Sequence, residues 1–438
     1  MRFLSLTVLL AACLAVISSA WKAGHHARGV HSAAVRASVG EGVARLAQAA
    51  VVACSLAFGC PLSALADRPL NAPTAAGTRV NSDAESLLRY GLPIDSKEIR
   101  DVQGSIESIK SNLKTRRLVF AQGDANNAKA KLADKKDKIL KQVPASRSAA
   151  AEAQYAKMQA DVVPLLAAMN LESQRGAGSV QERDALDAAF KLQADLSKDL
   201  SAFEELLVPE NFKREIPAEY ANLPALQGRA EVDIVVNRPS GEKFNVDGKN
   251  YDSVQLRLVI DGYNAPLTGG NFVDLVNKGF YNKRIITRSD GFVVQTGDAD
   301  PAGPEGPGPH GYVPAGNAAG EERIIPLELS FKGDKDLVFG STSEDEGRGA
   351  AAAVLPFQSY GTLGMARDEF ETNSASSQFF WLLFESDLTP AGKNMLDGRY
   401  TCFGYTTEGA DLLKSVQVGD VITSAKVVTG AANLVPGK

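Results

Sequence analysis

The sequence predicts an α+β multidomain protein in which an all-α helical bundle precedes a β domain. Between Ser82 and Leu207, apolar residues recur every three or four positions, which is typical of amphipathic helices. From Val254 onward the apolar period changes to two, which is typical of half-buried strands. A proline-bearing stretch between the two patterns has neither period and predicts a linker. With 438 residues the chain has room for both domains, which we place at residues 82–208 for the bundle, 209–228 for the linker and 229–438 for the β domain.

The first 66 residues predict a targeting presequence that is removed. Residues 1–20 have a basic start, an apolar run and a small-residue end, as in a secretory signal peptide, and residues 21–45 have the basic composition of a transit peptide. A second apolar run ends at Ala64–Ala66, a cleavage signal of the A-x-A type. Such stacked signals resemble the import address of thylakoid lumen proteins in algae with a complex plastid. The alternative is a single signal peptide followed by a chance apolar run. The mature chain would begin near Asp67 with a flexible arm at 67–81, and we expect it to have no stable membrane span.

Charge and composition narrow the possible chemistry. The formal net charge is −5, and removal of the basic presequence would make the remainder more acidic. An acidic protein is a poor match for a polyanion, so we expect no nucleic-acid partner. Beyond residue 66 the only cysteine is Cys402 and the only histidine is His310. These residues allow neither an intrachain disulfide nor a His-rich metal site, and we expect no metal and no cofactor.

The helical region carries start signals and apolar faces. Ser96 is placed to cap a helix whose apolar face runs from Ile99 to Leu113. Pro164 should kink or end a later helix, and Ser179–Glu182 forms a capping box for the next. Packing of these faces against each other predicts a bundle of four or five helices. A partner-binding coiled coil is the alternative use of the same apolar stripes.

The β region begins with a clear alternation and ends with a long connection. Val254–Ile260 alternate apolar and polar residues, as expected for a strand with one buried face. Thr268 is expected to cap the helix that follows. Residues 298–360 form a Gly- and Pro-rich connection with one short strand at Ile324–Leu329, which Pro326 confines to a sheet edge.

Linked motifs in the C-terminal half carry the functional prediction. The first runs from Arg288 to Asp298 (RSDGFVVQTGD), the second joins Gly361–Arg367 (GTLGMAR) to Ser377–Phe380 (SQFF), and the third is Leu396–Gly404 (LDGRYTCFG). In this order and approximate spacing they resemble the cyclophilin family of peptidyl-prolyl cis-trans isomerases. The resemblance implies a closed antiparallel β-barrel with capping helices. The two-domain layout is similar to that of multidomain cyclophilins of the thylakoid lumen.

The resemblance also assigns roles to individual residues. Proline isomerisation needs a dry pocket for the ring and a hydrogen-bond donor aimed at the prolyl nitrogen, because such a donor favours the twisted bond over the planar one. Arg288 is the expected donor, since a guanidinium stays charged and is rigid, and Phe292 and Gln295 complete the catalytic group. The alternatives are that Arg288 is an ordinary surface arginine, that Phe292 only packs in the core and that Gln295 is a polar residue on a strand surface. The residues expected to bind substrate are Met365, Ala366, Phe380, Met395, Leu396 and Tyr400.

Several positions depart from the family pattern. The gap between Arg288 and the Gly-Phe pair is one residue shorter than in the family. Met395 stands where the family often has tryptophan, and Tyr400 stands where it often has histidine. Val293 and Arg367 replace a common methionine and a common asparagine. We therefore expect the proline pocket to persist and the activity to be weak.

The resemblance implies a peptidyl-prolyl isomerase and folding helper of the thylakoid lumen that aids photosystem II assembly or repair. Its partners would be proline-containing segments of lumenal or thylakoid membrane proteins, photosystem II subunits among them. The alternative is a non-catalytic chaperone or scaffold, or a phosphatase regulator, that binds lumenal loops through the cyclophilin groove and the helical domain. Arg288, Phe292 and Gln295 favour the enzyme, whereas Met395 and the shortened spacing favour the alternative.

Overall fold

The computed structural model describes residues 81–173, 180–300, 302–317, 319–384 and 394–437. The predicted presequence at 1–66 lies outside these residues, as do all but the last residue of the predicted arm and the serine of the predicted capping box, Ser179. The described residues belong to one compact unit, which spans residues 77–438. Within the described ranges, no helix has both the length and the apolar character needed to cross a bilayer.

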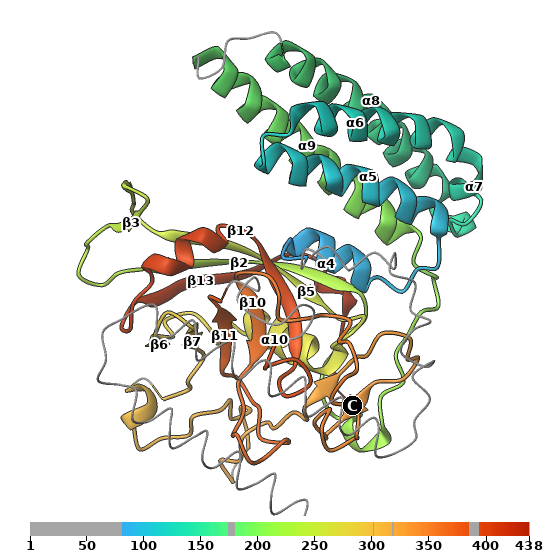
Figure 1. The fold of residues 1–438 in the computed structure, drawn as a ribbon. Helices are drawn as coiled ribbons and strands as arrows, with labels where there is room; N and C mark the ends of the chain where they lie inside the picture. Colours follow the sequence, from blue (N-terminus) through green and yellow to red (C-terminus); the bar gives the residue numbers. More distant parts are fainter. Residues whose placement is uncertain (1–80, 174–179, 301, 318, 385–393, 438) are drawn as a thin grey trace, which may run out of the picture. The chain divides into compact units, whose positions relative to one another are not determined.

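The first part of the described chain is helical, as predicted (Figure 1). α5, α6, α8 and α9 pack around a shared apolar core. Pro164 lies inside α8 and does not end it, because α8 packs against α6 and α9 and this contact holds the helix. The helical elements are α4 (Ala84–Gly91), α5 (Lys97–Lys114), α6 (Leu118–Asp134), α7 (Lys136–Leu140), the 3-10 turn η2 (Ala145–Arg147), α8 (Ser148–Ser173) and α9 (Val180–Leu206).

α5 shows why this region folds as helices. The Ser96 hydroxyl accepts a hydrogen bond from the amide of Ile99 at 3.3 Å, which satisfies one of the free amides at the helix start. The apolar residues at three- and four-residue spacing all face the bundle core, as predicted: Ile99, Val102, Ile106, Ile109 and Leu113. Their burial is the main stabilising contribution to the helix.

The β domain is built on an eight-stranded antiparallel sheet with the strand order β13-β2-β5-β12-β10-β11-β7-β6. β5 buries Val254, Leu256, Leu258 and Ile260 on one face, as the alternation predicts. The sheet strands are β2 (Arg229–Asn237), β5 (Val254–Asp261), β6 (Ile286–Ser289), β7 (Val293–Thr296), β10 (Thr362–Met365), β11 (Phe379–Leu382), β12 (Cys402–Glu408) and β13 (Val421–Thr429). The remaining elements of this domain are η3 (Ala218–Tyr220), β1 (Ala225–Leu226), β3 (Phe244–Val246), β4 (Lys249–Tyr251), α10 (Pro266–Asn277), η4 (Gly303–Glu305), β8 (Glu328–Leu329), β9 (Val338–Phe339), η6 (Ala410–Ser415), η7 (Ala431–Asn433) and β14 (Leu434–Val435).

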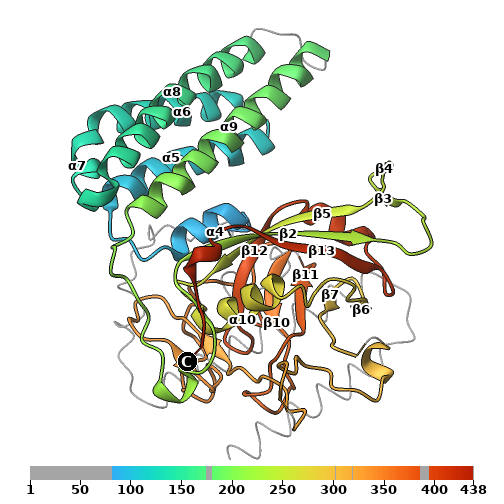
Figure 2. The same cartoon turned by 180° about the vertical axis from the view of Figure 1, so that it is seen from behind.

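The sheet curls, but its strand ladder does not close into a complete barrel, so the predicted closure is not confirmed (Figure 2). The edge strands β13 and β6 meet through an isolated bridge between Ile285 and Val421 and through nearby backbone hydrogen bonds. β6 has four residues and a register irregularity between Ile286 and Arg288. A short, bulged strand offers few backbone groups in register, which limits pairing at this edge.

The main core of the β domain lies between the sheet and α10. Phe272 of α10 packs against Phe379 and Phe403, and Trp381 of β11 is fully buried in the same core. The predicted cap of α10 is wrong: the helix begins at Pro266, so Thr268 lies inside it. The carboxylate of Glu328 accepts the amides of Leu267 and Thr268 at 3.1 and 2.9 Å instead. A cap from a distant strand has no local sequence signal.

α4 precedes the bundle in the sequence but packs on the outer face of the sheet. Leu87 and Leu88 join Phe357, Phe380 and Tyr405 in one buried cluster, which we call the outer-face cluster. Figures 1 and 2 show α4 and α10 on opposite faces of the sheet. The sheet is therefore covered on both faces at this point, although the sequence predicts α4 only as a bundle helix.

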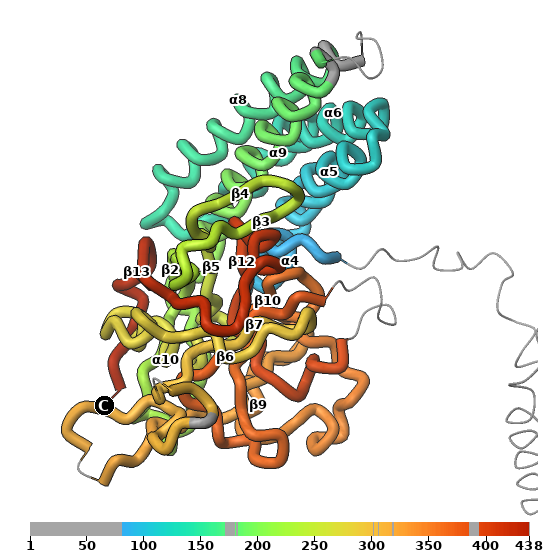
Figure 3. Tube along the Cα trace, turned by 90° about the vertical axis from the view of Figure 1, so that its left-hand side faces the viewer, coloured from blue at the N-terminus to red at the C-terminus, as the bar shows by residue number. Residues whose placement is uncertain are grey.

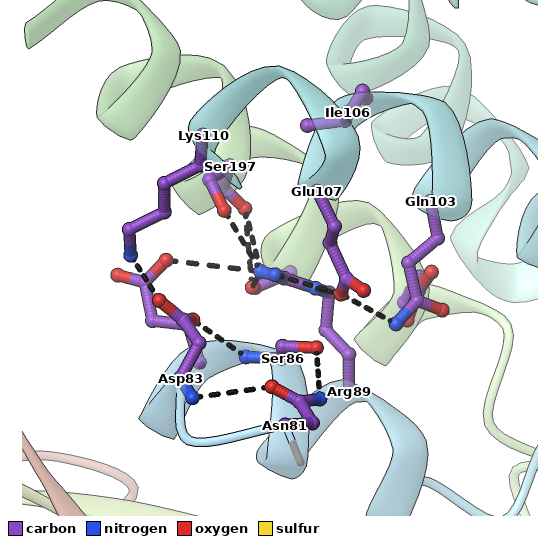
Figure 4. Close-up of polar contacts among 12 residues, drawn as sticks. Asn81, Asp83, Ser86, Arg89, Gln103, Ile106, Glu107, Lys110 and Ser197 are labelled. Atoms are coloured by element: carbon purple, nitrogen blue, oxygen red, sulfur yellow. Dashed lines mark hydrogen bonds and ion pairs between the residues drawn. The ribbon is translucent and has the colours of Figure 1, made fainter. Parts of the chain in front are cut away.

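A buried arginine connects α4 to the bundle (Figure 4). The Arg89 side chain is 1% exposed. Its Nε and Nη2 donate to Oε1 of Glu107 on α5 at 3.2 and 3.0 Å. Its Nη1 donates to the hydroxyls of Ser197 and Ser201 on α9 at 3.0 and 2.9 Å. These bonds satisfy the buried guanidinium, so α4 contacts the sheet through its leucines and two bundle helices through Arg89.

Part of the predicted linker at 209–228 belongs to the β domain. β1 pairs with β14, with Ala225 opposite Val435. Upstream, the Arg214 Nε donates to the carbonyl of Tyr263 at 2.8 Å. β1 has only two residues, which is too short to show an alternating apolar pattern. The three prolines of this stretch favour a linker instead.

The long connection between β7 and β10 gathers at one end of the β domain (Figure 3). The strand predicted at Ile324–Leu329 is shorter in the structure, where only Glu328–Leu329 pairs with β9. Ile325 makes an isolated bridge to Ala375. Pro326 has no amide hydrogen, which accounts for the interruption between the Ile325 bridge and β8.

Candidate functional site

A tight hairpin between β6 and β7 positions the first predicted site residues. The turn closes with a hydrogen bond from the amide of Asp290 to the carbonyl of Val293 at 3.3 Å. Gly291 has φ +80°, a conformation that residues with a side chain rarely adopt. Phe292 therefore lies in the turn, ahead of β7, and its side chain is 51% exposed.

Strand pairing places the motif residues in one row. Arg288 of β6 is opposite Gln295 of β7, and Gln295 is opposite Phe380 of β11. Phe380 is in turn opposite Gly364 of β10. A Cβ at Gly364 would lie 2.2 Å from the Phe380 ring, so only glycine leaves room for the ring. Three separate stretches of the sequence thus meet across four neighbouring strands.

This row opens into a cavity of about 830 Å³. Eight of the residues predicted for the site line it: Arg288, Phe292, Gln295, Ala366, Phe380, Met395, Leu396 and Tyr400. Met365 does not, because it points into the main core on the other side of β10, where it is 2% exposed. Adjacent strand residues face opposite sides, so Ala366 and Met365 cannot both face the cavity.

The cavity combines aromatic walls with charged lining residues from several segments of the chain. Phe292 stacks on Phe384 at 5.1 Å between ring centroids. Phe380 contacts Phe357 at 6.0 Å and meets the edge of Tyr400 at 5.8 Å. Through Phe357 and Phe380, the cavity wall is continuous with the outer-face cluster that α4 covers. These rings offer the kind of apolar surface that a proline ring can occupy.

The polar groups of the cavity are held by neighbours. The Arg288 side chain is 56% exposed, and its Nε donates to Oδ2 of Asp290 at 2.6 Å. The Gln295 Nε2 donates to Oε1 of Gln378 at 3.0 Å. Arg367 lies over the Tyr400 ring at 5.0 Å, and its Nε donates to the carbonyl of Arg399. The cation at Arg288 is therefore partly neutralised by an adjacent carboxylate.

The loop that carries Met395, Leu396 and Tyr400 is shaped by Asp397. Oδ2 of Asp397 accepts the amide of Asn394 at 3.0 Å, and Oδ1 accepts the amide of Phe357 at 2.8 Å. Asp397 is 5% exposed. These bonds fix the loop against the cavity wall, while the Met395 side chain stays 69% exposed. The sequence motif contains Asp397, but its supporting role depends on a contact with a distant loop and cannot be predicted from spacing.

A smaller hollow of about 360 Å³ adjoins the cavity and shares Gln295, Ala366 and Arg367 with it. His310 lies on its wall, with Nδ1 3.0 Å from Oδ1 of Asp298. The hydrogen bond and the charge of Asp298 raise the pKa of His310. In the part of the chain that the structure describes, no cluster of three or more His, Cys, Asp or Glu side chains is arranged to hold a metal.

Several lining residues were not predicted for the site. Val293 and Leu382 contribute to the apolar wall, and Glu344 and Arg399 form an ion pair of 3.2 Å at the rim. Val293 could have been found from the motif, because strand alternation places it on the same face as Gln295. Glu344 could not, since it comes from the long connection between β7 and β10.

Comparison with known proteins places both parts of the chain. Residues 246–431 match the family model of cyclophilin-type peptidyl-prolyl cis-trans isomerases. Residues 83–208 match the model described as the PsbQ-like domain of CYP38-like peptidyl-prolyl cis-trans isomerases. A crystal structure of a Cryptosporidium parvum cyclophilin-type isomerase covers 46% of this chain and 98% of that chain, with 20% identity and a TM-score of 0.30.

Two curated relatives match over most of their length. The chloroplastic peptidyl-prolyl cis-trans isomerase CYP38 of Arabidopsis thaliana is 41% identical over 355 residues, which are 80% of this chain and 75% of that protein. A putative thylakoid lumen peptidyl-prolyl cis-trans isomerase of Synechocystis sp. is 38% identical over 374 residues, which are 84% of this chain and 89% of that protein. The chain therefore belongs to the cyclophilin family of peptidyl-prolyl cis-trans isomerases.

Proposed function

We propose that the cavity at Arg288, Gln295 and Phe380 isomerises X–Pro bonds in partner proteins. The row that these residues form across three strands carries the proposal. It places a permanent cation and an amide beside aromatic walls. A proline ring on these aromatic walls would bring its nitrogen near the Arg288 side chain.

The rate acceleration follows from the electronic structure of the peptide bond. Its rotational barrier is about 18–20 kcal/mol, because the nitrogen lone pair is shared with the carbonyl. In the twisted state this lone pair is localised and accepts a hydrogen bond well. A donor from Arg288 would therefore stabilise the transition state more than either planar isomer. Gln295 would bind the backbone next to the proline.

Substitution of Arg288 tests this role. Arg288→Ala should reduce kcat/KM by about 100-fold or more, which is typical for the loss of one preorganised donor. The kcat/KM of Arg288→Lys should lie between those of the parent and of Arg288→Ala, because lysine keeps the charge but not the planar fork. The measurement is cis–trans exchange of a short Ala-Pro peptide by NMR, with Arg257→Ala as the control. Arg257 is an arginine paired with Asp233 outside the cavity.

A second candidate is a non-catalytic chaperone or scaffold that binds proline segments in the same cavity. It is favoured by one observation, the pairing of Arg288 with Asp290, which occupies part of the proposed donor. In that case the parent chain would bind the Ala-Pro peptide without accelerating its exchange. Arg288→Ala would then change binding only. The NMR experiment separates the two functions in one titration.

We propose further that the protein works in the thylakoid lumen of a plastid on proline-containing segments of lumenal or thylakoid membrane proteins, photosystem II subunits among them. The stacked signals in residues 1–66 support the location, as do the names of the two relatives, which describe one as chloroplastic and the other as a thylakoid lumen protein. The match of residues 83–208 to a PsbQ-like domain supports the link to photosystem II.

The site of processing provides a test of the location. N-terminal sequencing of protein isolated from lumenal fractions should find a start near Asp67, directly after the Ala64–Ala66 signal. A start near Trp21 would indicate a single signal peptide and would contradict a lumenal location.

A further inference from the structure

The carboxylate of Asp290 contacts two of the proposed catalytic residues at once. Its Oδ1 accepts the backbone amides of Phe292 and Val293 at 2.9 and 3.0 Å. Its Oδ2 lies 2.6 Å from both Nε and Nη2 of Arg288. One side chain therefore holds the turn that presents Phe292 and the cation that would act on the substrate.

This arrangement belongs to the shortened hairpin of this chain. With one residue fewer than the family pattern, Asp290 is only two positions from both Arg288 and Phe292. The carboxylate can therefore reach both in one turn. Partial burial would raise the pKa of Asp290, but the two amides and Arg288 outweigh it and lower the pKa, so Asp290 is ionised over the physiological range.

We propose that Asp290 is a positioning residue for isomerisation, which fixes the Arg288 guanidinium and the Phe292 turn as one unit facing the cavity. The proposal rests on the proposed isomerase function. A long, half-exposed arginine has many rotamers, and holding one of them in advance lowers the entropy cost of reaching the transition state. The carboxylate occupies Nε and Nη2, and Nη1 has no hydrogen-bond partner in the described part of the chain. That nitrogen remains available to the substrate.

The rest of the hairpin is held independently of Asp290. The Ser289 hydroxyl donates to the carbonyl of Val416 at 2.8 Å. β7 pairs with β11 along its whole length, from Val293 to Thr296. Removal of the Asp290 carboxylate should therefore change the direction of Arg288 and the turn without unfolding the sheet.

The test uses the full mature chain and four variants: Asp290→Asn, Asp290→Ala, Arg288→Ala and the double variant Arg288→Ala/Asp290→Ala. Asparagine keeps an acceptor for the turn amides but loses the charge, so it should retain part of the activity. Alanine loses both contacts, and we expect kcat to fall about tenfold, the effect of roughly 1.4 kcal/mol on a barrier. Peptide affinity of Asp290→Asn, measured by NMR titration with the Ala-Pro peptide, should change less than twofold, because asparagine keeps the turn and with it the Phe292 wall.

The double variant distinguishes positioning from a general structural role. If Asp290 acts through Arg288, its replacement should have a smaller effect once Arg288 is alanine, because only its hold on the Phe292 turn is then left to lose. The matched control is Asp247→Asn. Asp247 also lies in a hairpin turn, between β3 and β4, and its carboxylate also pairs with a cation, that of Lys414. That variant should match the parent. Thermal unfolding of each variant verifies that it is folded.

Three results would overturn the proposal. Unchanged or increased kcat in both Asp290 variants would show that the carboxylate does not help Arg288. An undiminished effect in the Arg288→Ala background would show that Asp290 acts on the fold alone. A parent chain without isomerase activity would reject the proposed function, and the inference with it, whereas an active parent with normal variants rejects only the inference.

Discussion

Glu204 and Glu328 are buried carboxyls whose protonation contributes to the dependence of stability on pH. Glu204 of α9 has Oε2 3.1 Å from Nη1 of Arg100, while its Oε1 has no hydrogen-bond partner among the described groups. Glu328 accepts the first amides of α10. Burial raises the pKa of each to about 7, because the opposing effects of Arg100 and of the two amides are smaller.

The sign of the pH effect follows from these values. An unfolded glutamate titrates near 4.5, so the raised folded pKa adds stability that is complete below 4.5 and is lost as pH rises through about 7. His310, whose pKa is also raised, acts in the same direction. We therefore expect Tm to increase when the pH falls from about 8 to about 5.5. A flat or opposite profile by thermal unfolding would contradict this.

Glu204→Gln separates this effect from other titrations. Glutamine is neutral at every pH, and Arg100 keeps its bonds to the carbonyl of Arg89 and to Oε1 of Gln103, at 2.9 and 2.7 Å. The variant should be more stable than the parent at about pH 8 and should show a weaker pH dependence. Glu210→Gln, at an exposed position after α9, is the matched control and should follow the parent curve.

At the same scale, the sequence predicts which residues of the candidate site lie together where a motif translates directly into strand pairing. Arg288, Gln295 and Phe380 were predicted from their motifs, and the pairing of β6, β7 and β11 places them side by side. The motif alone assigns Met365 to the site, although strand alternation next to Ala366 argues against it, and the structure buries Met365 in the main core. Asp290 could not be predicted, because its contacts depend on the geometry of a turn.

At the scale of elements, α4 shows what periodicity leaves open. Its leucines predict an amphipathic helix but not the surface that it covers. The structure places Leu87 and Leu88 in the outer-face cluster beside Phe380, so the helix supports the back of the cavity wall. The α10 cap failed as a prediction for a related reason, because Glu328 reaches it from β8. Contacts between distant elements have no signature in a local window.

Leu88→Ala tests this support. Leu88 is 4% exposed, and truncation of a buried leucine typically costs about 2–5 kcal/mol because a cavity is left. We expect a loss in that range by urea unfolding, together with weaker binding of the Ala-Pro peptide. Val163→Ala on α8 is the control, since Val163 is 50% exposed. Equal stability of the two variants would mean that α4 contributes little to the β domain.

At the scale of the whole molecule, polar contacts join the bundle to the β domain. Arg229 of β2 donates through Nη1 to Oε1 of Glu205 on α9 at 2.8 Å. Its Nη2 donates to the carbonyl of Leu88 on α4 and to Oδ2 of Asp261 on β5, both at 2.6 Å. Arg89 connects α4 to the bundle helices α5 and α9, and Arg229 connects α4 to the β domain. We expect the bundle and the β domain to unfold in one cooperative transition.

The position of Trp381 allows this cooperativity to be tested by intrinsic fluorescence and circular dichroism. The chain has two tryptophans, and the other, Trp21, lies in the predicted presequence. In a protein that begins near Asp67, intrinsic fluorescence would therefore come from a single indole in the core of the β domain, and it would shift to longer wavelength when water enters. Far-ultraviolet circular dichroism, by contrast, is dominated by the long helices α5, α6, α8 and α9. Thermal unfolding followed by fluorescence reports on the β domain, and unfolding followed by circular dichroism reports on the bundle, with no added label. Cooperative unfolding requires the two midpoints to coincide.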